Sequence, residues 1–329
     1  MYRLQRLWRP GIFQGGNRKD NYFEGWYFKL VDRSLQDIFA VIPGVSIKGP
    51  GSGSHSFIQL LDGKQAISSY FNFKISDFSY HRDRFDVSIG KNRFSSEGML
   101  LDIRQDGKTV KAEISFKDRV GWPGNFFSPG AMGWYTFVPF MECYHGVVSM
   151  DHGLEGSLEI DGRSIDLGGG KGYIEKDWGK SFPGGWIWLQ SNNFDANDPC
   201  SIMLSIARVP WRGRSFTGFI CGLLFRDDFY VLATYNGARI ENLDYSKGYD
   251  RVKASIVLKD LRLEVDASKK QSAQLASPVM GAMDGRINES IDSLIKVSLQ
   301  KGGKVIIDDT GRCAGSEIVN PEVLDYQKL

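Results

Sequence analysis

Cysteine and histidine are both scarce in this chain, which has four of each among 329 residues. The cysteines, Cys143, Cys200, Cys221 and Cys313, are far apart in the sequence and form no CxxC spacing. A chain of this length can build a hydrophobic core without covalent cross-links. We therefore expect four reduced thiols rather than a disulfide framework.

Long apolar runs and an excess of either charge are also absent. The longest apolar stretch, Phe219 to Phe225, ends at Arg226, whereas a membrane-spanning helix needs about 20 apolar residues. The 41 basic and 39 acidic residues give a formal net charge of +2, which offers no electrostatic support for nucleic-acid binding. Residues 1–10 contain three arginines but no apolar h-region and no cleavage site, so we expect a cytoplasmic protein.

Aromatic residues (13% of the chain) and 38 glycines are abundant, and turn dipeptides separate many strand-like runs. These dipeptides are Asp62-Gly63, Asp106-Gly107, Asp161-Gly162, Asn236-Gly237 and Gly302-Gly303. Each is typical of a two-residue type I′ hairpin, because both of its central residues tolerate positive φ. We therefore predict an all-β fold of antiparallel sheets. The one short helix expected is Pro321–Gln327, and Asn288–Lys296 is compatible with either a helix or a strand.

The length of the chain suggests two domains at roughly 150 residues each. No repeat of 20–50 residues is visible, which argues against a propeller or a solenoid. A proline and paired glycines at Ser181–Gly185 interrupt two strong strand patterns. We therefore predict an N-terminal β-domain at residues 1–183 and a C-terminal β-domain at residues 184–329, each a sandwich or a barrel.

The first segment of chemical interest is Tyr22–Lys29, YFEGWYFK. On a strand, Glu24 and Trp26 would point to the same face, because alternate side chains share a face. A carboxyl group among aromatic rings is either a buried acid with a raised pKa or a group at the rim or paired with arginine. The pattern leaves both interpretations open.

The second segment, residues 122–152, contains Trp134 and Tyr135 followed by two histidines, His145 and His152. Together with Cys143 or Glu142 the histidines resemble a zinc site, but the spacing matches no established ligand pattern. We therefore expect no metal. The histidines are either hydrogen-bonded strand residues or, for His145, a group that faces a cavity.

The third segment begins at Gly172, and on an extended chain Tyr173, Glu175 and Asp177 share one face. Two carboxyl groups that lie this close should have pKa values that are pushed apart, so that one can stay protonated near neutral pH. Trp178 is expected on the opposite face.

Farther along the same segment, Trp186, Trp188, Gln190 and Asn192 share a face, with aliphatic residues on the other one. Tryptophans followed by amides are typical of the wall of an amphiphilic cavity, although they can also simply fill a core. The glycine run at residues 168–172 lacks the GxxxxGK[ST] pattern, and the chain has no GxGxxG or GxSxG motif. Phosphate-loop, dinucleotide-binding and α/β-hydrolase interpretations are therefore rejected.

Three stretches resemble the tocopherol cyclase family: FEGWYFK (Phe23–Lys29), SHSFIQ (Ser54–Gln59) and YIEKDWGKSFPGGWIWLQSN (Tyr173–Asn192). The resemblance implies two lipocalin-like antiparallel β-domains with a cavity at or near their interface, as in the related carotenoid hydratase and Diels–Alderase-type proteins. The plant members close a chromanol ring on a prenylated benzoquinol. Without a plastid-type extension, this chain looks like a bacterial member.

The resemblance implies an enzyme of the intramolecular lyase or isomerase type, which protonates an alkene and traps the cation with a phenol oxygen. Such a site needs a neutral carboxylic acid, aromatic rings and exclusion of water. We expect Asp177 as proton donor, with Glu175 either tuning this acid or orienting the substrate. Glu24 is the second candidate acid, and His145 is the expected acceptor of the phenol proton. The residues expected to hold the substrate or stabilise the cation are Trp26, Trp134, Tyr135, Trp178, Trp186, Trp188, Gln190 and His55.

Other functions remain compatible with the same residues. A non-catalytic carrier of an isoprenoid or lipid would need the rings but no acid, and a hydratase would admit water to the cation. A third alternative is a cavity packed solid by Phe and Trp. In each ligand-binding case the partner is a lipophilic small molecule, and no cofactor is expected. Contact with a membrane surface is compatible with such a ligand, although no basic amphipathic helix is apparent.

Overall fold

The computed structural model describes residues 6–49, 53–139, 141–196, 198–211 and 213–326. These residues form antiparallel strands and short 3-10 helices, and none of them lies in an α-helix. The all-β prediction is thus confirmed. Within the same ranges, no helix has the length and apolar character needed to cross a bilayer.

The chain divides into two compact units. Unit 1 comprises Met1–Phe182 together with Leu275–Arg286, and unit 2 comprises Pro183–Gln274 together with Ile287–Leu329. The division expected from the sequence, 1–183 and 184–329, leaves Leu275–Arg286 in the second part, whereas the structure groups this segment with unit 1.

Hydrogen bonds explain why Leu275–Arg286 belongs to unit 1. The Gln59 side-chain amide donates to the Ala276 carbonyl at 3.1 Å, and the Ala276 N–H donates back to Gln59 Oε1 at 2.9 Å. The Ser46 hydroxyl donates to the Gly281 carbonyl at 2.7 Å. These partners are more than 200 residues apart, and local sequence patterns carry no information about them.

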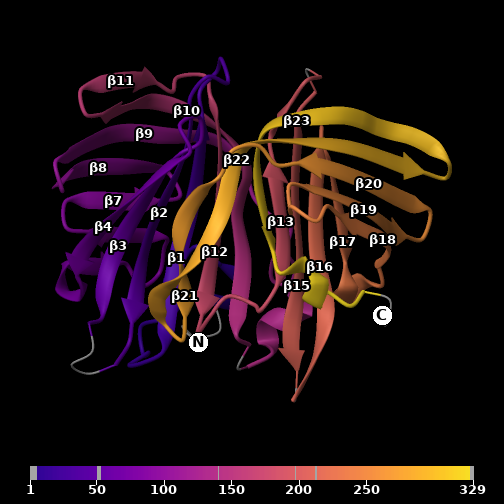
Figure 1. Ribbon diagram of the computed structural model, residues 1–329, viewed down its shortest axis with the longest axis horizontal. Coiled ribbons are helices and arrows are strands. Elements are labelled where there is room, and N and C mark those ends of the chain that lie inside the picture. Colours follow the sequence, from indigo (N-terminus) through magenta and orange to yellow (C-terminus); the bar gives the residue numbers. More distant parts are fainter. Residues whose placement is uncertain (1–5, 50–52, 140, 197, 212, 327–329) are drawn as a thin grey trace. The chain divides into compact units, whose positions relative to one another are not determined.

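Unit 1 contains one large antiparallel sheet, drawn from indigo to magenta in Figure 1, with the strand order β4-β3-β2-β1-β12-β10-β9-β8-β7-β6-β5 and with β11 paired to β10. Its strands are β1 (Tyr22–Val31), β2 (Ile38–Ile47), β3 (His55–Asp62), β4 (Ile67–Lys74), β5 (Phe78–Tyr80), β6 (Asp86–Ile89), β7 (Asn92–Ser95), β8 (Gly98–Gln105), β9 (Lys108–Val120), β10 (Cys143–Ile160), β11 (Arg163–Asp166) and β12 (Lys171–Gly179). The 3-10 helices η1 (Arg6–Trp8), η2 (Ile75–Asp77) and η3 (Gly133–Phe137) complete it.

One hydrophobic cluster fills the concave side of this sheet. Strands from both ends of the strand order contribute to it, for example Phe71 on β4 and Val87 on β6, together with Phe28 and Ile174 from the middle. Because all these side chains meet in a single cluster, the sheet must curve around its own core, as lipocalin-like sheets do.

Unit 2 contains most of a second antiparallel sheet, with the order β17-β16-β15-β13-β23-β22-β20-β19-β18, β14 paired to β23 and β21 paired to β22. Its strands are β13 (Trp186–Ser191), β14 (Asn193–Phe194), β15 (Cys200–Trp211), β16 (Arg214–Phe225), β17 (Asp228–Ala233), β18 (Arg239–Tyr245), β19 (Arg251–Leu258), β20 (Leu261–Ser268), β21 (Ala273–Val279), β22 (Ala282–Lys301) and β23 (Lys304–Val319). The 3-10 helices are η4 (Thr234–Asn236) and η5 (Pro321–Val323).

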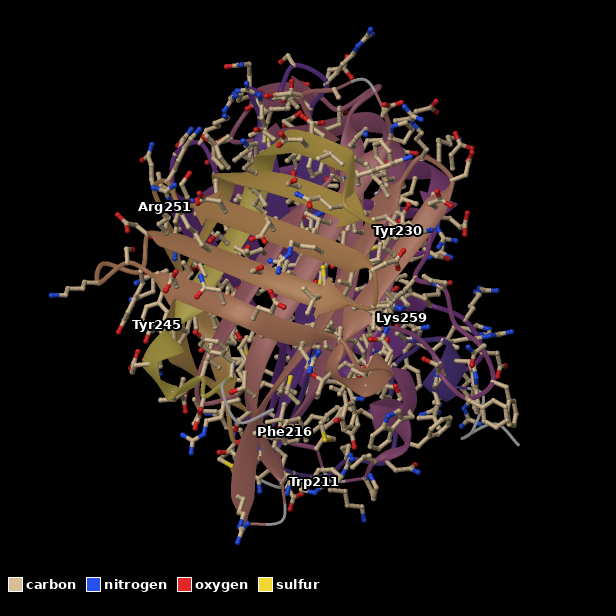
Figure 2. The ribbon with its side chains drawn as sticks, turned by 90° about the vertical axis from the view of Figure 1, so that its right-hand side faces the viewer. Trp211, Phe216, Tyr230, Tyr245, Arg251 and Lys259 are labelled. Atoms are coloured by element: carbon tan, nitrogen blue, oxygen red, sulfur yellow. The ribbon has the colours of Figure 1, made fainter. Side chains whose placement is uncertain are left out.

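The core of unit 2 also collects aliphatic side chains from nearly every strand, including Leu189, Leu204, Ile256 and Leu299. Figure 2 shows β18, β19 and β20 running between the turn near Tyr245 and Arg251 and the turn at Lys259. In the same view the β15–β16 hairpin extends toward Trp211 and Phe216.

Three of the five predicted two-residue hairpins are present. Asp106-Gly107, Asp161-Gly162 and Gly302-Gly303 all have positive φ at both residues and join directly paired strand ends. The ambiguous segment Asn288–Lys296 is part of strand β22. The helix expected from Pro321 is a single 3-10 turn that ends at Val323, and the last residue of that prediction, Gln327, lies outside the described residues.

The other two hairpin predictions were wrong. At Asp62-Gly63 the loop is four residues long, because Asp62 Oδ1 accepts hydrogen bonds from the N–H groups of Lys64 and Gln65 and stabilises a wider turn. At Asn236-Gly237 a 3-10 turn joins β17 to β18, which lie at opposite ends of the strand order and are not partners. A dipeptide specifies the turn but not which strands will pair.

Candidate active site

Strand β12 separates two groups of ionisable side chains, because successive residues on a strand point to opposite faces. Tyr173, Glu175 and Asp177 lie on one face, and Lys176 and Trp178 lie on the other. This alternation follows the sequence prediction. The neighbouring strands, β10 on one side and β1 on the other, determine what each face contacts.

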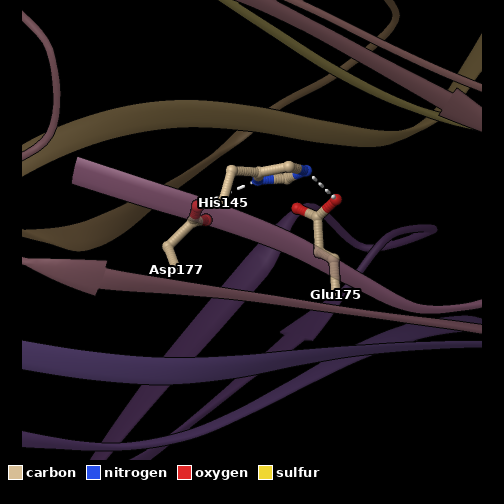
Figure 3. A group of neighbouring side chains, drawn as sticks. All are labelled: His145, Glu175 and Asp177. Carbon is tan, nitrogen blue, oxygen red and sulfur yellow. Dashed lines mark hydrogen bonds and ion pairs between the residues drawn. The ribbon is translucent and has the colours of Figure 1, made fainter. Parts of the chain in front are cut away.

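The first group consists of His145, Glu175 and Asp177 (Figure 3). His145 on β10 lies directly opposite Asp177 in the strand register, and Nδ1 of its ring is 2.9 Å from Asp177 Oδ1. Its Nε2 atom is 3.5 Å from Glu175 Oε2. The imidazole therefore bridges the two carboxyl groups, each of which contacts a different ring nitrogen.

Burial is graded across this group. The Glu175 side chain is 6% exposed, that of His145 is 13% exposed, and that of Asp177 is 24% exposed. Asp177 is therefore the member of the group that is most accessible to a bound molecule, whereas Glu175 lies behind it.

Three further groups surround the cluster. The Tyr173 hydroxyl donates to Glu175 Oε2 at 2.6 Å, and burial together with the nearby Glu175 charge raises the pKa of Tyr173 well above its ordinary value. Burial raises the pKa of Cys143 strongly, and the charges of Asp177, Glu142 and Glu175 add to this effect. Burial also raises the pKa of Glu142. The site is thus poor in water and disfavours additional negative charge.

The loop before β10 reaches the cluster through Met132. The backbone N–H of His145 lies 3.1 Å from the sulfur of Met132, and the Tyr144 hydroxyl donates to the Val138 carbonyl at 2.7 Å. These contacts fix the start of β10 and hence the position of the His145 ring.

The donor atoms of His145, Glu175 and Asp177 lie within 4.8 Å of one another, so these residues could hold a metal ion. His152, which the sequence analysis considered as a possible ligand, is not part of this group. Its Nδ1 is 2.9 Å from the Ser149 hydroxyl, and its ring packs on Phe116. Burial lowers the pKa of His152 to about 3, with a smaller contribution from the charge of Arg119.

The second group, on the other face of β12, is an ion pair between Glu24 and Lys176. Both side chains are completely buried, and Lys176 Nζ lies 2.7 Å from Glu24 Oε1. Glu24 also accepts hydrogen bonds from the Tyr22 hydroxyl and from the N–H groups of Gln14 and Gly15. Burial lowers the pKa of Lys176, although Glu24 opposes this shift. Of the two interpretations of Glu24, the structure thus shows a paired carboxylate, with lysine in place of arginine.

Trp26 and Trp178 belong to this second group. Lys176 Nζ lies 4.3 Å from the centre of the Trp178 ring and 5.5 Å from that of Trp26. Trp26 is fully buried, stacks on Phe85 and donates from Nε1 to the Gly11 carbonyl at 2.8 Å. Both rings therefore lie on the core side of the sheet, on the face of β12 opposite to Asp177.

Trp134 and Tyr135 lie in η3, where their rings stack with centroids 4.2 Å apart. Trp134 is 46% exposed, and partial burial raises the pKa of Tyr135. His55 lies at the start of β3, three strands from β12 in the sheet order, and its Nε2 is 2.6 Å from the Tyr70 hydroxyl.

Trp186, Trp188 and Gln190 lie on β13 in unit 2, on the face opposite to its aliphatic core. Trp186 donates from Nε1 to Glu317 Oε2 at 2.6 Å, and the Trp188 ring occupies the space next to Gly315 where a side chain would otherwise be. Gln190 is fully buried, and neither polar atom of its amide has a hydrogen-bond partner among the described residues. A buried amide of this kind is suited to bind a ligand or a water molecule.

Sequence reasoning missed four ionisable residues: Lys176, which belongs to the second group on β12, and Lys269, Glu289 and Glu317, which lie near the tryptophans of β13 in unit 2. Glu289 lies opposite Glu317, which lies opposite Trp188, on three adjacent strands. Lys269, whose pKa is lowered by burial, is held near these two glutamates. For Lys176 a signal was available, because it alternates with two carboxylates on a strand. For Lys269, Glu289 and Glu317, no local sequence pattern indicates that these residues lie near one another.

Comparisons with known proteins identify the family of this chain. Residues 89–319, more than two thirds of the chain, match the family model described as tocopherol cyclase-like. The chain belongs to the tocopherol cyclase-like family. A chloroplastic rice protein (Oryza sativa subsp. japonica) named as a probable tocopherol cyclase is 24% identical over 366 residues, covering 90% of this chain and 75% of the rice protein. A chloroplastic tocopherol cyclase of Zea mays is 35% identical over 103 residues, covering 28% of this chain and 21% of the maize protein.

Solved structures of proteins that are not named as cyclases also have a fold similar to that of this family member. Kievitone hydratase from Nectria haematococca aligns with a TM-score of 0.51 at 13% identity, covering 95% of this chain and 94% of that protein. CghA aligns with a TM-score of 0.56 at 10% identity, covering 91% of this chain and 88% of that protein. At these identities the likeness concerns the fold, which is confirmed as two lipocalin-like antiparallel units.

Proposed function

We propose that this protein is a tocopherol cyclase-like enzyme that closes an oxygen-containing ring on a prenylated quinol by acid catalysis. The observation that carries the proposal is the contact of one imidazole with two carboxyl groups in a largely buried group, His145 with Glu175 and Asp177. Membership of the tocopherol cyclase-like family supports the substrate class.

In the proposed reaction the proton of Asp177 is transferred to the less substituted carbon of a trisubstituted alkene, which leaves a tertiary cation on the other carbon. A phenol oxygen of the same molecule attacks this cation, and a carbon–oxygen bond forms. The phenol proton is then taken by His145. The product is an isomer of the substrate, so no other reactant is needed.

The geometry of His145 supports return of a proton to Asp177. Its Nε2 atom accepts the phenol proton, and its Nδ1–H, 2.9 Å from Asp177 Oδ1, returns a proton to the carboxylate. Asp177 is thereby protonated again, and the imidazole, left with its hydrogen on Nε2, exchanges this proton with solvent and returns to the Nδ1–H tautomer before the next turnover. General acid–base catalysis by groups in direct hydrogen-bond contact typically contributes about 10²–10⁴-fold to a rate.

Glu175 and Tyr173 position the imidazole. Glu175 faces the Nε2 side of the ring at 3.5 Å, and the Tyr173 hydroxyl holds Glu175 by a 2.6 Å hydrogen bond. A charge on Glu175 stabilises the imidazolium form that exists between the two proton transfers. The low exposure of Glu175 limits the access of water, which would otherwise compete with the phenol for the cation.

The test is the variant Asp177→Asn, which keeps the size of the side chain and removes the proton donor. Turnover of a prenylated methylbenzoquinol, followed by chromatography of the chromanol, should fall by about 10³-fold or more, and the unfolding temperature should stay close to that of the wild type. Asp102→Asn, which changes a partly exposed carboxylate on β8 of the same unit, is the matched control and should leave turnover unchanged.

Reaction in D₂O adds a second readout, since protonation of the alkene by Asp177 should place one deuterium on the new ring. Turnover of the Asp177→Asn variant above a tenth of the wild-type value would show that the acid is another residue. A product that is heavier by one molecule of water would assign the protein as a hydratase. Tight binding of the quinol without any product would assign it as a carrier.

A further inference from the structure

Residues 120–141 are the longest stretch of the chain without an ionisable Asp, Glu, Lys, Arg or His side chain, at 22 consecutive residues. Seven of them are aromatic. We refer to residues 121–139, which follow β9 and include η3, as the aromatic loop. The reaction proposed above uses none of its aromatic rings.

The aromatic loop presents its rings to solvent. Phe127 is 78% exposed and Phe126 is 72% exposed, more than any other large hydrophobic side chain among the described residues. Trp134 and Phe137 are 46% and 43% exposed. Soluble monomers rarely expose several large apolar side chains close together, and such patches commonly mark an interaction site.

Hydrogen bonds hold the two phenylalanines in this exposed position. The side-chain oxygen of Asn125 accepts from the N–H groups of Phe127 and Ser128, both at 2.9 Å. The backbones of Asn125 and Ser128 also form an isolated β-bridge. The tip of the loop is therefore a defined turn, and a collapse of the rings onto the protein would break these bonds.

A basic segment packs against this loop. The Trp8 ring lies 5.6 Å from Phe126 and 5.6 Å from Phe137, and its Nε1 donates to the Asn125 carbonyl at 3.1 Å. Residues 1–19 contain five basic residues and no acidic one. Of these, Arg9 is exposed next to Trp8, and its Nη1 donates to the backbone carbonyl of Asp83.

We propose that the aromatic loop, together with Arg6–Arg9, is a docking surface for an anionic phospholipid bilayer. Phe126 and Phe127 enter the boundary between head groups and acyl chains, where aromatic side chains are favoured. The exposed Arg9 contacts the phosphate groups of the head groups, and such a contact contributes about 1 kcal/mol per basic residue near the surface. Because the loop has no charged residue, its insertion requires no desolvation of an ion.

The same loop leads to the candidate active site. Met132, six residues after Phe126, contacts the backbone N–H of His145 through its sulfur atom. The loop proposed to meet the bilayer therefore also contacts the start of β10, which carries His145. The docking surface does not depend on the proposed reaction and can be tested without any substrate.

The test is co-sedimentation of the full chain with vesicles of phosphatidylcholine and phosphatidylglycerol at low salt. The wild type should bind these vesicles and should bind pure phosphatidylcholine vesicles more weakly. Phe126→Ser combined with Phe127→Ser should weaken binding by about tenfold or more. Arg9→Gln should weaken it by about fivefold at low salt and less at high salt.

Two controls keep the result interpretable. Val305→Ser changes an exposed side chain of β23 (59% exposed) and should leave vesicle binding within about twofold of the wild type. Phe127→Ser alone, which preserves the contact of Phe126 with Trp8, guards against a folding defect in the double variant and should still weaken binding.

Three outcomes would overturn the proposal. The first is a wild type that does not bind anionic vesicles at low salt. The second is a double variant that binds them as well as the wild type does. The third is a stable dimer, seen by analytical ultracentrifugation, that the double variant dissociates, because a second copy of the chain would then be the occupant of this surface.

Discussion

Glu175, Lys176 and Asp177 are consecutive on β12, yet they take part in two groups of ionisable side chains with opposite properties. On the core face, Lys176 and Glu24 form a fully buried ion pair in which Glu24 has four donor groups. On the other face, Glu175 and Asp177 share one imidazole, and Asp177 keeps partial access to solvent.

The comparison teaches which of two buried carboxylates can be reactive. The donors around Glu24 all belong to the protein, and two of them are backbone N–H groups of Gln14 and Gly15, so this residue serves to hold the N-terminal segment. Lys176 does the same by donating to the Ile12 carbonyl at 2.8 Å. Among the described residues, the hydrogen-bond partner of the Asp177 side chain is His145, which can accept or return a proton. A reactive acid needs a partner that can exchange a proton with it, and part of its carboxyl group must be accessible to a substrate.

The largest expected effect is on stability and comes from breaking the core pair. Lys176→Met leaves Glu24 buried without its counter-ion, and the free energy of unfolding should fall by about 3–5 kcal/mol. Urea denaturation measures this change. Adding Glu24→Gln to the same chain should recover part of the loss, because no uncompensated charge is then buried.

Lys111→Met is the matched control for this prediction. Lys111 pairs with Glu159 at 3.6 Å on the surface of the same sheet, and both side chains are well exposed. Its loss should change the free energy of unfolding by less than about 1 kcal/mol. Equal effects of the two methionine substitutions would contradict the structural role of the Glu24–Lys176 pair.

A smaller effect, dependent on pH, distinguishes the two histidines of β10. The pKa of His152 is about 3 in the folded protein and about 6.5 in an unfolded chain, so the unfolded state binds more protons between these values. Its contribution to stability is therefore complete above pH 6.5 and is lost as the pH falls toward 3. Between pH 7 and pH 5 this loss amounts to about 2 kcal/mol.

His152→Gln removes the titrating group and should flatten the pH dependence of the free energy of unfolding over this range. Urea denaturation of both chains at pH 7, 6 and 5 makes the comparison, with the difference between them increasing as the pH falls. Parallel curves for the two chains would show that His152 has the same pKa in the folded and unfolded states, so that burial does not lower it.

The smallest effect concerns the positioning of Glu175. Tyr173→Phe removes the hydroxyl that donates to Glu175 at 2.6 Å and preserves the packing of the ring. We expect kcat to fall by about tenfold, equal to about 1.4 kcal/mol in the barrier, with KM nearly unchanged. The pH profile of kcat should also shift, since a purely structural defect would leave the profile in place. Unaltered kcat and pH profile would remove Tyr173 from the mechanism.

The fold was predictable from the sequence to a large extent, because hairpin dipeptides and alternating patterns are local signals. Asp106-Gly107 and Gly302-Gly303 form the turns that their residue types favour, and β12 alternates as its sequence indicates. The prediction at Asp62 failed for a local reason, because the Asp62 side-chain oxygen stabilises a wider turn. The prediction at Asn236 failed for a topological reason, because the two strands that flank it pair with other strands.

The candidate site was predictable only in part. The shared face of Tyr173, Glu175 and Asp177 followed from the two-residue period of a strand. The position of His145 beside Asp177 did not, because the two residues are 32 positions apart and meet only through the register of β10 against β12. The same holds for Lys176, whose partner Glu24 comes from β1.

The sequence by itself determined which side chains share a face, since that depends on the backbone geometry of a single strand. The tertiary structure alone decided which faces meet. It therefore decided that Glu24 pairs with a lysine and that Asp177 contacts a histidine. Strand pairing is set by the burial of the whole hydrophobic cluster, to which residues far apart in the chain contribute together. For that reason Glu24 became part of the framework and Asp177 became the candidate acid, although both are carboxylates beside tryptophan in the same sheet.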